Sequence, residues 1–240
     1  MGDLDPRVLF DVVDLMGVLA NGVLGGAVAR HLKFDLVGFT VLAVVSGLGG
    51  GMLRDVLLQV GFPVALTNSA YLSTAIAGAV IAFFLQLRGK WTNRVLIVAD
   101  ALSLGCWAAT GTSKALAAGL SWLPSIMIGV ITAVGGGMIR DIAVGQVPRV
   151  FGGNTLYATG ALIGSLEMAV LYNLGLPNWG MAAAILTSAT VTVVARRRGW
   201  RLPNAGEWDV RFPRPDRLRP RVRRGRRKPQ EDPGPAGPER

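Results

Sequence analysis

The residues best suited to chemistry lie in a seven-residue string that occurs twice in the chain. It reads GGGMLRD at positions 49–55 and GGGMIRD at positions 135–141, each time near the end of a long apolar stretch. Three consecutive glycines weaken a helix by about 1 kcal/mol each relative to alanine. The Arg-Asp step places charge where the surroundings suggest lipid, and such residues usually mark function. The alternative is that the glycines only let helices pack closely, but two copies of one string favour a functional interpretation.

The two strings belong to a longer duplication. They are 86 positions apart, and the same offset pairs further identical residues without a gap: Asp14 with Asp100, Gly25 with Gly111, Asn68 with Asn154, Tyr71 with Tyr157, Ala75 with Ala161 and Gly78 with Gly164. Residues 8–88 and 94–174 are therefore predicted to be two copies of one structural unit.

The composition indicates an all-α membrane protein. Hydrophobic residues make up 51% of the chain and the mean hydropathy is +0.43. A membrane-spanning helix needs about 20 apolar residues. Seven segments fit and are predicted to be transmembrane helices: 8–29, 36–58, 70–87, 95–113, 122–144, 156–174 and 178–195. The second and fifth contain the glycine triplets and are expected to be broken there.

Other chemistry has little support in the sequence. Cys106 is the only cysteine, so an internal disulfide and a cysteine-based metal site are excluded. His31 is the only histidine and lies in a predicted loop, so histidine-based catalysis or metal binding has almost no support. We find no nucleophile–base arrangement and no metal-ligating cluster, and therefore expect neither an enzyme nor a resident cofactor. Residues 1–199 are predicted to form one transmembrane domain.

Basic loop residues predict the orientation of the chain. One side of the predicted bundle receives the basic loops around residues 30–33, 88–94 and 149 and the cluster 196–198, whereas the other receives only Arg7 and Lys114. The N-terminus is then outside, and the C-terminus is cytoplasmic. Because each repeat holds three helices, the second repeat is inverted relative to the first. Inverted repeats with interrupted helices are typical of transport proteins, with the pathway between the halves.

Helix rise and orientation place the charged residues at two depths. The two predicted clusters are Asp14, Arg54 and Asp55, and Asp100, Arg140 and Asp141. Sequence neighbours do not face each other on a helix, so we expect Arg54 to pair with Asp14 rather than with Asp55. Each cluster would then carry a formal charge of −1. Together with backbone carbonyls freed at the glycines, this favours a small cation. The alternative is that the charges form purely structural ion pairs.

The chain changes character from Arg196 onward. This segment holds 15 of the 25 basic and 6 of the 15 acidic residues, which gives it a net charge of +9 out of +10 for the whole chain. Residues 200–240 are rich in proline and arginine and are predicted to be disordered. We interpret the tail first as a topology anchor, and second as a partner of anionic lipid headgroups, at about 1 kcal/mol per basic residue. We expect no nucleic-acid partner.

The paired string, the inverted three-helix repeats and the seventh helix resemble prokaryotic TRIC proteins, the trimeric intracellular cation channel family. The resemblance covers about residues 8–195. It implies a homotrimer in the plasma membrane, with one pore per protomer that conducts monovalent cations, chiefly potassium. By motif match, the pore-associated residues are Gly49, Gly50, Gly51 and Arg54, and Gly135, Gly136, Gly137 and Arg140; Asp55 and Asp141 follow in the same strings. The same domain has also been called a glycine transporter, so a secondary transporter of a small zwitterion is the alternative.

Overall fold

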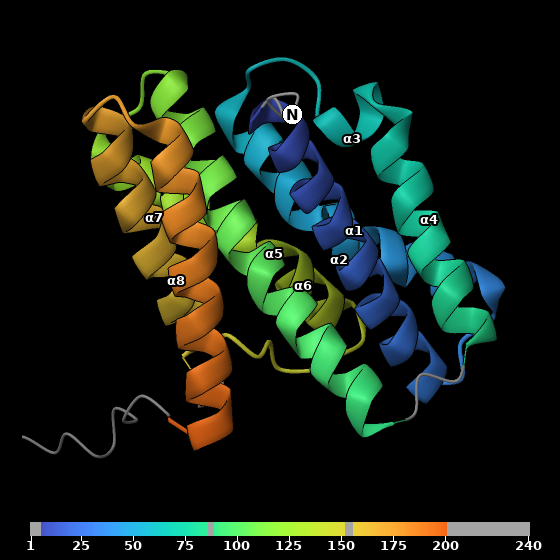
Figure 1. Ribbon diagram of the computed structural model, residues 1–240. Helices are drawn as coiled ribbons and strands as arrows, with labels where there is room; N and C mark the ends of the chain where they lie inside the picture. Colours follow the sequence, from blue (N-terminus) through green and yellow to red (C-terminus); the bar gives the residue numbers. More distant parts are fainter. Residues whose placement is uncertain (1–5, 86–88, 152–155, 201–240) are drawn as a thin grey trace, which may run out of the picture. The chain divides into compact units, whose positions relative to one another are not determined.

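The computed structural model describes residues 6–85, 89–151 and 156–200, which fold into eight α-helices (Figure 1). The helices are α1 (Pro6–His31), α2 (Leu36–Leu58), α3 (Val64–Thr67), α4 (Ser69–Phe84), α5 (Lys90–Ala117), α6 (Trp122–Ala143), α7 (Tyr157–Asn173) and α8 (Pro177–Arg198). The tail predicted to be disordered is residues 200–240, and all of it except Trp200 lies outside the described ranges. Each of the seven predicted segments coincides with one helix, and the short α3 is an addition.

Five of these helices, α1, α2, α5, α6 and α8, are long and apolar enough to cross a membrane. The other two predicted spans, α4 and α7, have 16 and 17 residues. Asn68 caps α4, because its side-chain oxygen accepts a hydrogen bond from the backbone N–H of Ala70 at 3.0 Å. The helical part of the chain is thus an all-α membrane protein.

The predicted breaks at the glycine triplets are wrong, because α2 and α6 each run as one helix through their triplet. The glycines instead let the two helices touch. A methyl group on Gly50 would overlap the carbonyl oxygen of Thr132, and one on Gly136 would overlap the carbonyl oxygen of Ser46. The sequence analysis gave this close packing of helices at glycine as the alternative to a functional interpretation of the triplets.

The contacts of the triplets are reciprocal. Ser46 and Thr132 are equivalent under the 86-residue offset, as are Gly50 and Gly136, and each glycine faces the other half's polar residue. Ser46 lies against Gly136, and Gly50, one turn later in α2, lies against Thr132, one turn earlier in α6. The two helices therefore run in opposite directions where they cross. The two halves are therefore related by an approximate two-fold axis through this crossing. Figure 1 shows the same relation for the packed helices α1 and α5, which run in opposite directions.

The core lies around this crossing, and the outside is apolar. Buried residues of α1, α2, α4, α5, α6 and α7 form the central cluster, which includes Val18, Leu48, Leu104, Trp107 and Val134. The outward faces carry many exposed large apolar side chains, as a lipid-facing surface requires. Trp91, Trp122 and Trp179 are exposed within the first turns of α5, α6 and α8, where an interfacial aromatic belt is expected.

Candidate functional site

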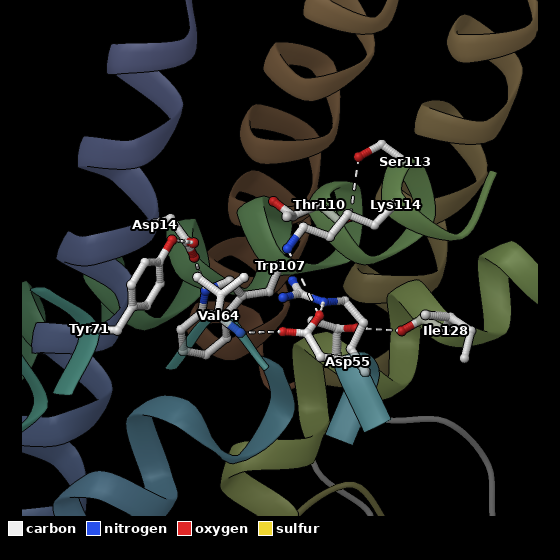
Figure 2. A network of polar contacts seen from close by, with 11 residues as sticks. Asp14, Asp55, Val64, Tyr71, Trp107, Thr110, Ser113, Lys114 and Ile128 are labelled. Carbon is white, nitrogen blue, oxygen red and sulfur yellow. Dashed lines mark hydrogen bonds and ion pairs between the residues drawn. The ribbon is translucent and has the colours of Figure 1, made fainter. Parts of the chain in front are cut away.

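The first group of polar contacts centres on Asp14 of α1. Its two carboxylate oxygens accept hydrogen bonds from the Tyr71 hydroxyl at 2.6 Å and from the Trp107 indole N–H at 2.7 Å. Figure 2 shows Asp14 between these two rings, which come from α4 and α5. Three helices therefore meet at one carboxylate, and both of its oxygens are occupied by protein donors.

Arg54 pairs with its sequence neighbour, which corrects the expectation that it pairs with Asp14. Its Nε lies 2.7 Å from Asp55 Oδ1, and within the described ranges no ion pair joins Arg54 to Asp14. Adjacent positions on one helix therefore do not prevent this contact. The other oxygen of Asp55 accepts from the backbone N–H of Val64, and Lys114 Nζ lies 3.9 Å from Oδ1 (Figure 2).

The second half repeats this arrangement on α6. Arg140 donates from Nε and Nη2 to Asp141 Oδ1 at 2.9 and 2.8 Å, and Asp141 Oδ2 accepts from the backbone N–H of Arg149. Arg140 Nη1 also lies 3.3 Å from the Ser46 hydroxyl of α2. Because both members of the Arg140–Asp141 pair are buried, the pair is held rigidly beside the α2–α6 crossing.

Asp100 is the counterpart of Asp14 but has fewer partners. Tyr157, the equivalent of Tyr71, donates to Asp100 Oδ1 at 3.1 Å. Asn21 of the first half is the equivalent of Trp107, but its amide donates to the Gly17 carbonyl oxygen of its own helix and not to Asp100. Among the described residues, none donates to the other carboxylate oxygen of Asp100, and Asp100 lines a cavity.

That cavity has a volume of about 510 Å³, whereas the equivalent one beside Asp14 holds only about 30 Å³. The large cavity is lined by charged and polar side chains: Asn21, Asp100, Arg140, Asp141, Arg149, Tyr157, Thr192 and Arg196. The small cavity is lined by the equivalent first-half residues Asp14, Arg54, Asp55 and Tyr71, and by Trp107 of the second half. The structure thus brings each predicted trio of charged residues to one cavity.

The predicted charge of −1 per cluster holds for the charged residues that line the small cavity, Asp14, Arg54 and Asp55, but is wrong for the large cavity. The large cavity has three arginines and two aspartates, for a formal charge of +1, because Arg149 and Arg196 join it. The small cavity with Lys114 beside it is formally neutral. Arg149 and Arg196 are exposed, however, so solvent screens their charge. Asp100, whose charge no described salt bridge compensates, lies farther in.

The glycines of the strings divide into two roles. Gly49, Gly50, Gly135 and Gly136 lie at the helix crossing, where each faces the other helix. Gly51 and Gly137 line the small and the large cavity. A methyl group on either would meet only its own string's arginine, at 3.8 Å for Gly51 and 3.6 Å for Gly137. The crossing is therefore sterically fixed, and the cavity-facing glycines have space.

Sequence reasoning left several lining residues out of the predicted site. Tyr71 and Tyr157 were paired by the 86-residue offset, and that signal was sufficient to include them. Trp107 and Asn21 break the offset, so a search for identical pairs misses both. Arg149 and Arg196 appeared only as topology signals. Among the described residues, no group of three or more His, Cys, Asp or Glu side chains is placed to hold a metal ion.

Comparison with known proteins gives a consistent result. The sequence model of a family described as Glycine transporter matches residues 11–87 and again residues 97–173. A UPF0126 membrane protein of Deinococcus radiodurans is 35% identical over 80% of this chain and 89% of its own length. A UPF0126 membrane protein of Vibrio cholerae is 32% identical over 80% of this chain and 79% of its own length.

Two solved structures of TRIC proteins share this fold. A structure that addresses conductance through TRIC cation channels aligns with a TM-score of 0.75 and 31% identity, over 81% of this chain and 96% of that one. The TRIC orthologue of Rhodobacter sphaeroides aligns with a TM-score of 0.73 and 29% identity, over 80% and 99%. The predicted resemblance to prokaryotic TRIC proteins is confirmed.

Proposed function

This chain belongs to the family described as Glycine transporter, alongside the UPF0126 membrane proteins, and from its TRIC-like fold we propose that it is a channel for monovalent cations, chiefly potassium. The observation that carries the proposal is the likeness to TRIC cation channels across four-fifths of the chain, at 31% identity. That likeness extends over both halves and therefore over both copies of the charged string.

The cavity beside Asp100 supports a route for ions within one protomer. It lies against the crossing of α2 and α6, and Gly137 lets the backbone of α6 form part of its wall. Arg140 is compensated by Asp141, so the inner charge available to a mobile ion is that of Asp100. A cation in the cavity would offset this carboxylate, whose burial without a counter-charge is costly.

The remaining features of the proposal follow from the sequence and from the TRIC resemblance. We propose seven membrane spans, with α4 and α7 as the shorter two, and two inverted repeats. The N-terminus is outside the cell and the C-terminus is cytoplasmic, in the plasma membrane. The protein forms a homotrimer with one pore per protomer. The large cavity then opens toward the cytoplasm, and the basic tail lies where anionic headgroups can bind it.

A second candidate is a secondary transporter of a small zwitterion such as glycine. The description of the matching family favours it, and so does the mixture of arginines and aspartates around one cavity of about 510 Å³. An amino acid carries one charge of each sign, so Arg149 or Arg196 would hold its carboxylate, and Asp100 its ammonium group.

The two candidates separate in one reconstitution experiment. Full-length protein is placed in liposomes, and potassium flux down a gradient is measured beside uptake of labelled glycine. Potassium flux without glycine accumulation supports the channel, and the reverse supports the transporter. Asp100→Asn should lower the potassium flux about fivefold, because a unit charge at 4 Å is worth about 1 kcal/mol in water.

Asp35→Asn is the matched control for this substitution. It also removes one carboxylate, but Asp35 is exposed and caps α2 through the backbone N–H of Gly38, a role that asparagine fulfils equally well. Its flux should equal that of the unchanged protein. Equal losses in both variants would mean that Asp100 has no special role in conduction.

A further inference from the structure

The duplicated core is symmetric in its backbone contacts but asymmetric in its cavities. The strings, the Tyr–Asp hydrogen bonds and the helix crossing occur in both halves. The cavity beside Asp14 nevertheless has a volume of only about 30 Å³, against about 510 Å³ for the cavity beside Asp100. Two differences accompany this: Thr192 and Arg196 of α8, a helix outside the duplication, line only the large cavity, and one bulky residue lines only the small one.

Trp107 is that residue. Under the 86-residue offset it is equivalent to Asn21, and each of the two lines the cavity of the opposite half: Trp107 lines the small one and Asn21 the large one. The Trp107 indole is 7% exposed and packs in the central core cluster. Its N–H also donates to one Asp14 oxygen, whereas no second donor to Asp100 is found among the described residues.

We propose that Trp107 is the closing residue of the ion pathway on the Asp14 side. The indole fills the cavity and its hydrogen bond to Asp14 holds it there, so water and ions reach the Asp100 cavity but are stopped at Trp107. Moving the indole away from Asp14 would both widen the small cavity and release a carboxylate oxygen toward it. The part of this inference that concerns ions rests on the proposed channel function, whereas the part that concerns the exclusion of water does not.

Two reporter positions allow a test that does not depend on conduction. Gly51 and Gly137 are equivalent, face the small and the large cavity, and have room for a side chain. Each is changed to cysteine in the full-length chain with Cys106→Ala. The rate of modification by a small methanethiosulfonate reagent is measured in detergent, where both faces of the protein are accessible. Gly137→Cys should react rapidly and Gly51→Cys slowly.

Trp107→Asn gives the small cavity the residue type that lines the large cavity at the equivalent position, Asn21. The modification rate of Gly51→Cys should rise by about tenfold, as expected when a space for one or two waters becomes a solvent-filled cavity. Trp107→Phe keeps most of the volume but cannot donate to Asp14, so its rate should lie between the two. A Trp107→Phe rate equal to that of the unchanged protein would overturn the role of the hydrogen bond.

Asn21→Trp is the reciprocal arm and protects the test against a Trp107 variant that does not fold. An indole at position 21 enters the open cavity, and modification of Gly137→Cys should slow by about tenfold as water is displaced. Unchanged rates in both Trp107→Asn and Asn21→Trp would overturn the inference and leave Trp107 as a core residue.

Potassium flux in liposomes separates this inference from the proposed function. If the unchanged protein conducts, Trp107→Asn should conduct several-fold faster, and an equal flux would overturn the placement of Trp107 on the ion pathway. If neither protein conducts although the modification rates change as expected, the channel proposal fails. In that case Trp107 still closes the cavity to water.

Discussion

At the scale of single residues, the main finding is how the buried charges are paired. Each arginine of the duplicated string bonds to the aspartate that follows it. Asp14 and Asp100 each accept a hydrogen bond from a tyrosine of a different helix. The buried ion pairs are local to one helix, whereas the Tyr–Asp hydrogen bonds join separate helices. Asp14 and Asp100 therefore link elements, and Arg54 and Arg140 do not need them as counter-charges.

The pairing of Arg54 can be measured by a double-mutant cycle. Arg54→Ala should destabilise the protein by about 3–5 kcal/mol, because removing one partner leaves the other buried charge uncompensated. Adding Asp55→Asn should recover part of that loss. Thermal unfolding in detergent gives the relative stabilities, and the difference between the double and the summed single changes gives the coupling.

Asp14→Asn is the matched control, since it removes a carboxylate from the same cavity wall but not from the pair. Its effect should simply add to that of Arg54→Ala. Coupling of Arg54 to Asp14 and additivity with Asp55 would contradict the observed pairing.

At the scale of elements, the glycine triplets are the point where two antiparallel helices touch. Gly50 and Gly136 have no space for a side chain, while Gly51 and Gly137 do. In each triplet, the first two glycines contact the other helix and the third lines a cavity. This division explains why the string contains more glycine than a helix crossing alone requires.

Substitution by alanine should separate these roles. Gly50→Ala should destabilise the protein by about 1–3 kcal/mol through overpacking against the Thr132 carbonyl. Gly51→Ala should be neutral or stabilising by up to about 1 kcal/mol, because it improves helix propensity without a clash. Apparent melting temperatures in detergent test both. Equal behaviour of the two variants would favour a hinge at the triplet instead.

The helices show how far the sequence alone reaches. Apolar length and the 86-residue offset predict all seven long helices, and Asn68 is recognisable as a cap because its side chain acts locally. Propensity alone predicts a break at Gly49–Gly51, but packing against α6 outweighs about 1 kcal/mol per glycine. The partner of Arg54 was missed because side-chain reach was judged from helical spacing. Trp107 was missed because its role lies in a difference between the repeats.

At the scale of the whole molecule, duplication produces two similar halves, and α8 packs only on α5 and α7 of the second half among the principal contacts. The proposed orientation places the Asp100 cavity toward the cytoplasm. Charge along the chain is equally uneven, because the tail carries nearly all of the net charge. The orientation of the chain in the membrane therefore decides which side of the membrane the Asp100 cavity faces.

Cysteine labelling in intact cells tests this orientation. In a chain with Cys106→Ala, a cysteine introduced at Asp3 should react with an impermeant reagent, whereas one at Gly234 should react only after the cells are opened. The physical reason is the excess of basic residues in loops on the tail's side. Reaction at Gly234 from outside would contradict the inverted-repeat topology.

The most direct test of the central claim is the potassium current of Gly137→Cys, recorded in a planar bilayer before and after modification. Gly137 lines the large cavity beside Asp100, and a side chain there faces open space. A positively charged methanethiosulfonate reagent should reduce the current several-fold, a neutral reagent of equal size should reduce it less, and the parent chain with Cys106→Ala should not respond. A current unaffected by either reagent, with labelling verified by mass, would contradict conduction through this cavity.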